Sequence, residues 1–278
     1  MLFVTLAVLS VLASPVPSGG QTTEPDQTPP AGSSTPQAPV VSPALPPTQP
    51  APAFDRPISW KLLLPNMISD QEHIWTFPAR LVQGKDWIPA SFVLGSTAGL
   101  VALDPTTAAW FRNTTAFHGF NNIFTGNATA AGTFIAPVSL YVVGLVRKDA
   151  KMERTALFAG EAVADAEIVA TVLKDATRRL RPADIPPSGN YSDSWFDSHG
   201  SFLRGNGSFP SGHAIAAFSV ATVVARRYGN HRWVPYAAYG AAGLVGFSRL
   251  TLSAHFVSDV FMGAALGYSI SRFTVLRQ

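Results

Sequence analysis

Six apolar segments rich in alanine and glycine constrain the fold of this chain more than any other feature of its sequence. Each segment is long enough for a helix, and the alternation of apolar and polar residues that marks a half-buried strand is nearly absent. Apolar helices that have no sheet to cover bury their surfaces against one another. We therefore expect an all-α fold, a helical bundle of about six core helices. The six segments lie near residues 88–103, 131–146, 156–181, 212–227, 233–247 and 256–275.

The first 54 residues differ in composition from the rest of the chain. Residues 2–13 form an apolar run that is too short to cross a bilayer and is typical of the core of an export signal. Residues 15–52 hold 12 of the 23 prolines and no lysine or arginine, so this stretch buries too little apolar surface to offset the entropy of ordering. We predict a signal peptide over residues 1–14, a disordered proline-rich linker over 15–54 and one helical domain over 55–278. The domain is then exported, to the periplasm or another extracytoplasmic space.

Two opposing features decide whether the helices cross a membrane. If all six segments spanned, the basic connections at 147–154 and 226–232 would lie on one side and the polar motifs on the other, as the positive-inside rule requires. Against this, Glu161, Asp165 and Glu167 point in different directions around the third segment, where each would be costly in lipid. We therefore expect a water-soluble or peripheral domain, with membrane association possible. The alternative is an integral membrane protein with its site on the outer face.

The composition excludes several kinds of site and partner. The chain has no cysteine, which rules out disulfides, thiolate metal ligands and a thiol nucleophile. The net charge is only +3, and no long basic run is interleaved with aromatic residues, so we expect no nucleic-acid partner.

A first cluster of charged residues ends the third apolar segment, in Lys174-Asp-Ala-Thr-Arg-Arg-Leu-Arg181-Pro. Lys174 and Arg181 are seven residues apart, about two helical turns, and would share one face of a helix that ends near Arg181 before the proline. Glu167 lies one heptad before Lys174 and could hold the lysine in place. We interpret Arg178 and Arg179 as surface cations whose charged heads reach water.

A second cluster, Pro210-Ser-Gly-His213, is typical of a helix start that binds an anion. Ser211 is a good N-cap residue, and Gly212 has no side chain to keep a ligand from the backbone N–H groups. A helix N-terminus offers unpaired donors and a partial positive charge, which suits phosphate. His213 would then lie in the first turn, beside the anion.

A third cluster contains Arg249, His255 and Asp259. If a helix runs from about Ala254, the histidine and the aspartate lie one turn apart on the same face. The carboxylate can then accept a hydrogen bond from the imidazole N–H, which fixes the tautomer and aims the other nitrogen at a substrate. A histidine held in this way can act as a nucleophile or as a base. In isolation, the cluster could equally be a structural pair that ties two helices together.

Together the three clusters form a set that suits phosphoryl transfer. Such a reaction depends mainly on positioning and on charge stabilisation, with a nucleophile on one side of phosphorus and an acid at the leaving group. Two histidines and three cations can supply both without a metal ion. We therefore predict no metal and no cofactor.

The motifs Lys-x6-Arg-Pro, Pro-Ser-Gly-His and Ser-Arg-x5-His-x3-Asp occur here in this order and are matched at every position. Over about residues 130–275 the chain resembles the superfamily of type 2 phosphatidic acid phosphatases and vanadium haloperoxidases. The resemblance implies a helical bundle and a phosphohistidine intermediate. The acidic third segment is more similar to the secreted acid phosphatases of that superfamily than to its integral membrane members.

The resemblance also implies a role for each motif residue. His255 would attack phosphorus, Asp259 would orient His255, and His213 would protonate the leaving group. The implied phosphate ligands are Lys174, Arg181, Ser211, Gly212 and Arg249.

The leading hypothesis is therefore a metal-independent phosphatase that hydrolyses phosphate monoesters of a lipid or of a small soluble molecule. A vanadate-dependent haloperoxidase is the alternative within the same fold, because vanadate and phosphate share charge and shape. A non-catalytic protein that binds anions or lipids is the alternative from another class.

Overall fold

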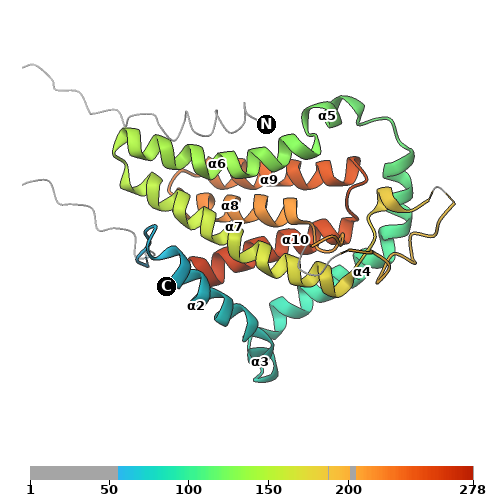
Figure 1. The fold of residues 1–278 in the computed structure, drawn as a ribbon, viewed down its shortest axis with the longest axis horizontal. Coiled ribbons are helices and arrows are strands. Elements are labelled where there is room, and N and C mark those ends of the chain that lie inside the picture. Colours follow the sequence, from blue (N-terminus) through green and yellow to red (C-terminus); the bar gives the residue numbers. More distant parts are fainter. Residues whose placement is uncertain (1–55, 187, 201–204, 278) are drawn as a thin grey trace, which may run out of the picture.

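The computed structural model of the chain describes residues 56–186, 188–200 and 205–277. The predicted signal peptide and the predicted proline-rich linker lie outside these residues. Within the described residues there is no strand, so the predicted all-α fold is confirmed (Figure 1). The α-helices are α2 (Leu63–Trp75), α3 (Phe77–Val82), α4 (Trp87–Asn113), α5 (His118–Ile123), α6 (Gly126–Arg147), α7 (Ala150–Thr177), α8 (Gly212–Arg227), α9 (Trp233–Thr251) and α10 (Val257–Ile270).

Each of the six predicted segments coincides with a long helix, namely α4 and α6 to α10. Two short elements complete the described chain, a 3₁₀ turn η1 (Pro182–Asp184) and a π turn η2 (Ser271–Val275). The third predicted segment was too long, because α7 ends at Thr177, where Arg178 takes a left-handed conformation with φ 43° and ψ 40°.

Helix α8 lies at the centre of the bundle, where it contacts α7, α9 and α10 (Figure 1). The main core cluster joins Phe158 of α7, Ile215 and Val223 of α8 and Ile270 of α10, all of them buried. Fully buried alanines on α7 accompany these side chains and let the helices approach closely. The buried alanines are Ala159, Ala162, Ala166 and Ala170.

Two glycines set the distance between α10 and α8. A Cβ on Gly263 would lie 2.6 Å from the carbonyl oxygen of Ser211, and a Cβ on Gly267 would lie 2.4 Å from that of Ile215. Real Cβ atoms do not come this close to backbone, so α10 can lie at this short distance from α8 only with glycine at these positions. The backbone N–H of Ser211 donates to the carbonyl oxygen of Asp259 (3.0 Å), which joins the starts of the two helices.

The two ends of the bundle differ in their polar residues. At one end, the Nε of Arg227 in α8 donates to Thr155 near the start of α7 (2.7 Å), and the ammonium of Lys151 lies 4.6 Å from the ring centroid of Tyr228. The basic connections 147–154 and 226–232 therefore share this end. The three predicted motifs meet at the opposite end, where α7 and α9 finish and α8 and α10 begin.

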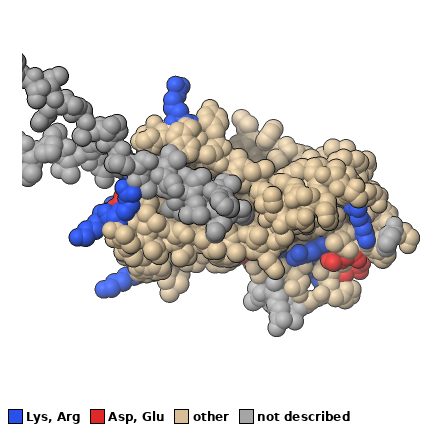
Figure 2. Space-filling model, turned by 90° about the horizontal axis from the view of Figure 1, so that it is seen from above, with Lys and Arg blue, Asp and Glu red and all other residues tan. Residues whose placement is uncertain are grey.

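Helices α4 and α6 are both long and apolar enough to cross a membrane, by length and composition. Little of either is covered by protein: only 11% of the apolar window of α4 and 22% of that of α6 is buried. Phe92 on α4 is 70% exposed and Phe134 on α6 is 63% exposed. On the face that Figure 2 shows, the visible lysines and arginines lie toward the two ends, and the described surface between them consists mostly of other residues.

Two of the acids that argued against a membrane-spanning third segment are buried in the protein. Glu161 is 1% exposed and lies 2.9 Å from the guanidinium of Arg56, and Asp165 is fully buried and accepts a hydrogen bond from Gln71 (2.9 Å). The argument that these two carboxylates would meet lipid was therefore wrong. Their partners come from the start of the described chain and from α2, which packs against α7.

Candidate active site

The candidate nucleophile, His255, lies in the connection between α9 and α10 and is 4% exposed. Its Nδ1 lies 2.9 Å from the carbonyl oxygen of Ser208 and 3.6 Å from the nearer carboxylate oxygen of Asp259. A carbonyl can only accept, so this contact places the ring proton on Nδ1 and leaves Nε2 with a free lone pair. The carbonyl of Ser208, which the sequence did not single out, is thus the closest group that fixes the tautomer.

The pKa of His255 lies below the usual value for histidine. Burial is the main cause, and the positive charges of Arg181 and Lys174 lower the pKa further, while Asp259 raises it. The ring is therefore neutral at neutral pH, which is the form that a nucleophile or a base requires.

Asp259 reaches His255 by a different route from the predicted one. Helix α10 begins at Val257, so His255 precedes the helix and the pair does not share a helical face. The carboxylate of Asp259 caps the first turn by accepting from the backbone N–H of Phe256 (2.9 Å). It also accepts from the hydroxyl of Ser208 (2.5 Å), so Ser208 contacts both members of the pair.

Arg179 is not the surface cation that the sequence suggested. It is 1% exposed, and its guanidinium carbon lies 4.2 Å from the ring centroid of Trp195 and 3.8 Å from that of Phe256. One nitrogen of the guanidinium donates to Asp259 (2.7 Å) and the other to Asp104 of α4 (2.8 Å). The neighbouring Arg178 is exposed, as predicted.

The sequence contains a signal for Asp104 that we did not use. This aspartate is the one acidic residue of α4, which is otherwise an apolar helix of 27 residues. An isolated charge in such a helix usually faces the protein interior and has a partner there. Asp104 is fully buried, and its partner is Arg179, 75 positions away.

The three predicted phosphate-binding cations come from three different segments. Lys174 is in the last turn of α7, Arg181 lies beyond the end of that helix in an extended conformation, and Arg249 is in the last turn of α9. The predicted shared helical face of Lys174 and Arg181 was therefore wrong, because α7 ends between them. Both residues nevertheless act electrostatically on His255, so their charges converge on the same site.

The second motif begins α8 as predicted, with Ser211 at the N-cap and Gly212 as the first helical residue. Ser211 is fully buried, and its hydroxyl has no hydrogen-bond partner among the residues that the structure describes. A buried hydroxyl without a partner is costly, which is consistent with a polar ligand at this position. A Cβ on Gly212 would meet Lys174 Nζ at 3.1 Å and a carboxylate oxygen of Glu167 at 3.2 Å, so glycine leaves room for these two side chains.

His213 follows in the first turn of α8 and is partly exposed. Burial lowers the pKa of His213 to about 4, and the charge of Arg249 contributes. Its Nε2 lies 3.3 Å from the carbonyl oxygen of Gly126, at the start of α6. At neutral pH and without a bound anion, this imidazole is therefore neutral.

The connection between α5 and α6 also belongs to the site, and the sequence analysis missed it. The guanidinium of Arg249 donates to the carbonyl oxygens of Phe124 (3.2 Å) and Thr125 (3.5 Å). Thr125 is the N-cap of α6 and accepts from the backbone N–H of Ala128. A threonine before an apolar segment is a recognisable N-cap signal, but no local pattern shows that this helix start faces Arg249.

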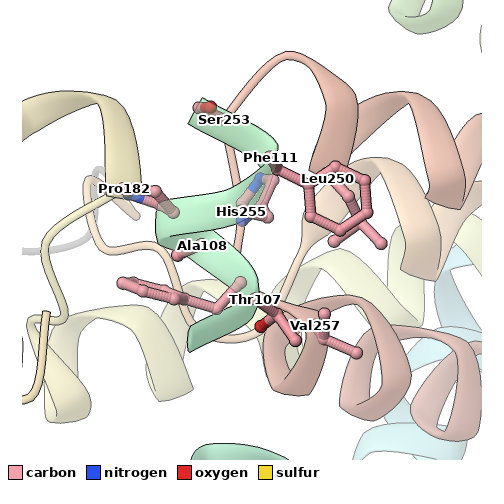
Figure 3. A pocket seen from close by; sticks show the side chains of 9 residues that line it. Thr107, Ala108, Phe111, Pro182, Leu250, Ser253, His255 and Val257 are labelled. Carbon is pink, nitrogen blue, oxygen red and sulfur yellow. The ribbon is translucent and has the colours of Figure 1, made fainter. Parts of the chain in front are cut away.

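An apolar hollow lies next to His255, between α4 and the connection from α9 to α10 (Figure 3). Phe111 of α4 and Leu250 of α9 line it together with His255. No group of three or more histidine, aspartate or glutamate side chains that could hold a metal ion occurs in the described part of the chain.

The family model described as the PAP2 superfamily matches residues 155–278. This part of the chain belongs to the PAP2 superfamily. The matched residues include most of α7, all of α8 to α10 and all three motifs, so the resemblance to type 2 phosphatidic acid phosphatases is confirmed there.

The chain is also similar to curated proteins. It is similar to lipid A 1-phosphatases of Rhizobium johnstonii and Rhizobium etli, each 31% identical over 109 residues, which is 39% of this chain and 42% and 44% of those proteins. A lipid A 1-phosphatase of Porphyromonas gingivalis is 43% identical over 61 residues, 22% of this chain and 14% of that protein. The chain thus spans less than half of the length of these relatives.

One solved structure is also similar to this chain. It is a transmembrane PAP2-type phosphatidylglycerolphosphate phosphatase from Bacillus subtilis, with a TM-score of 0.37 and 21% sequence identity. The match covers 75% of this chain and 94% of the other.

Proposed function

We propose that this protein is a metal-independent lipid phosphatase that works through a phosphohistidine intermediate. The observation that carries the proposal is the state of His255: its Nδ1 is held by the Ser208 carbonyl, its Nε2 is left free, and the positive charges of Arg181 and Lys174 act on it. A neutral, oriented imidazole beside converging positive charges is suited to attack a phosphate group.

Phosphate binding would use the three cations and the start of α8. Lys174, Arg181 and Arg249 neutralise the phosphate oxygens, and the unpartnered hydroxyl of Ser211 donates to one of them. The backbone N–H of Gly212, at the free start of α8, adds a donor that points along the helix axis. Glu167, beside Lys174 at Gly212, helps to hold the lysine in the site.

The reaction would proceed in two displacements at phosphorus. In the first, His255 Nε2 forms a bond to phosphorus while the ester P–O bond breaks, and His213 gives its proton to the departing oxygen. In the second, a water molecule attacks phosphorus, the P–N bond breaks, and His213 takes the proton from the water. Since His213 is neutral in the empty site, the negative charge of the bound phosphate must raise its pKa so that it carries the proton.

The exposed faces of α4 and α6 and the names of the relatives support a lipid substrate. We propose that α4 and α6 lie in a bilayer, where their uncovered apolar side chains contact lipid. The basic connections at one end of the bundle would face the cytoplasm and the candidate active site the outer surface, in agreement with the positive-inside rule.

Phosphate release by the purified full-length chain tests this proposal. A phosphatidic acid in mixed micelles and a small aryl phosphate are assayed in parallel, with His255→Ala as the inactive reference. We expect the lipid to be hydrolysed in the presence of a chelator, with inhibition by vanadate and no turnover by His255→Ala. Activity that survives the substitution, or that a chelator abolishes, would contradict the mechanism. Efficient cleavage of the aryl phosphate alone would contradict the lipid substrate.

A further inference from the structure

A buried chain of charges runs from α4 to the candidate nucleophile. Asp104 accepts from one nitrogen of the Arg179 guanidinium (2.8 Å), and Asp259 accepts from the other (2.7 Å). Asp259 in turn lies 3.6 Å from Nδ1 of His255. The two carboxylates are fully buried and the guanidinium is 1% exposed, so water screens none of these charges well.

Each link of this chain is fixed by additional contacts. Arg179 is held between the rings of Trp195 and Phe256, and its Nε donates to the hydroxyl of Ser194 (3.2 Å). Ser258 accepts from Arg179 (2.7 Å), and its hydroxyl also contacts Asp104. These contacts hold the guanidinium of Arg179 in one position, and the guanidinium in turn fixes the position of the Asp259 carboxylate.

The summed charge of Asp104, Arg179 and Asp259 indicates what Asp104 contributes to the site. Arg179 paired with Asp259 alone would form a neutral pair, which offers little support to a positive charge on His255. With Asp104 included, the three groups sum to one negative charge. His255 acquires a positive charge when its Nε2 bonds to phosphorus, so this surplus negative charge becomes balanced at that moment.

The other charged groups around His255 cannot provide this balance. Lys174 of α7, Arg181 before η1 and Arg249 of α9 are cations, and His213 of α8 is neutral in the empty site. Asp259 is the acid that contacts His255, and its charge is shared with Arg179.

We propose that Asp104 and Arg179 are positioning residues for His255: Arg179 fixes the carboxylate of Asp259, and Asp104 restores the negative charge that Arg179 would otherwise cancel. The proposal rests on the proposed phosphatase function. It links a helix with a largely uncovered apolar face, α4, to the nucleophile through three side-chain contacts.

The test is the pH dependence of kcat/KM for lipid phosphate hydrolysis in Asp104→Asn and in the double variant Asp104→Asn with Arg179→Met. The acid limb of this profile reports the pKa of the nucleophile in the free enzyme. Asp104→Asn brings the charge sum to zero, so protonated His255 is less stable and the limb moves to lower pH. A unit charge roughly 10 Å away at an effective dielectric constant of about 20–40 gives a shift of about 0.6–1.2 pH units.

The double variant removes the guanidinium as well and leaves the single charge of Asp259, which Ser208 and the Phe256 N–H still hold. We expect the limb to return to the wild-type position, with kcat reduced because the carboxylate is less well fixed. The matched control is Asp104→Asn with Arg178→Met, which changes the exposed neighbouring arginine and should leave the limb where the single variant places it. A merely structural role would lower the amount of folded enzyme without moving the limb.

The outcomes separate this inference from the proposed function. No shift in Asp104→Asn, or a shift that the loss of Arg179 does not reverse, would overturn the role of the charge chain. A wild-type protein without phosphatase activity would overturn the proposed function instead. In that case a ¹⁵N NMR titration of labelled histidines, with His255 identified by its absence in His255→Ala, measures the same pKa differences without turnover.

Discussion

Replacement of Gly263 by alanine is expected to disturb the active site by pushing two helices apart. The new Cβ would lie 2.6 Å from the carbonyl oxygen of Ser211, whereas ordinary contacts begin at 3.4 Å, so α10 and the start of α8 must separate by about 0.8 Å. Ser211 is the N-cap before His213, and α10 carries Asp259. The substitution therefore acts on the fold and on the site at once.

The magnitude follows from two opposing terms. Alanine in a helix interior is favoured over glycine by roughly 1 kcal/mol, whereas forced overpacking costs about 1–3 kcal/mol. We expect a net loss of stability of up to about 2 kcal/mol. A displacement near 1 Å of groups that hold a reacting phosphate can lower the rate about 100-fold, so activity should fall much further than stability.

Thermal unfolding and lipid phosphate hydrolysis of the same detergent-solubilised preparation measure the two effects. Gly243→Ala in α9 is the matched control, since a Cβ there meets nothing within 4 Å, and it should be neutral or stabilising with full activity. If Gly263→Ala were as active and as stable as the control, the close approach of α10 and α8 would not determine the site geometry.

Three further predictions follow from the contacts at the site and from the uncovered helices. Burial lowers the pKa of His213 in the folded protein to about 4, below the unfolded value near 6.5. The stability of the protein should therefore fall as the pH drops from about 6.5 toward 4. His213→Asn should flatten the plot of melting temperature against pH over this range. Ser208→Ala keeps the carbonyl that holds His255 but removes the hydroxyl that donates to Asp259. We therefore expect kcat to fall about 10-fold or more with KM nearly unchanged. An equal rise in KM would instead indicate a role of the hydroxyl in substrate binding. The double variant Phe92→Lys with Phe134→Lys places charges on the uncovered faces of α4 and α6. It should reduce the fraction of the expressed protein that is recovered with the membranes. Unchanged recovery would argue against contact of these faces with lipid.

Most of the fold was predictable from the sequence because long apolar segments without alternation can only be helices that pack together. All six predicted segments are helices, and α8 begins at Gly212, where the serine and glycine indicated a start. The end of α7 was predicted less well, since the chain leaves the helix at Arg178 well before the proline that served as the signal. The candidate site residues could be proposed because their types and spacing form motifs within short stretches of sequence.

The tertiary structure alone decided what holds those residues in place. The sequence by itself determined an all-α bundle and the histidines, cations and carboxylate of the candidate site. It gave no means to see that Arg179 is buried, that its partner is Asp104 on another helix, or that the Ser208 carbonyl is nearer to His255 than Asp259 is. Spacing along a chain reports neighbours within one helix, whereas the burial of a charge depends on which distant segment packs over it. The same reason applies to Glu161 and Asp165 of α7, which the sequence analysis took as evidence against a membrane-spanning helix and which the structure places in the interior, where α2 packs against α7.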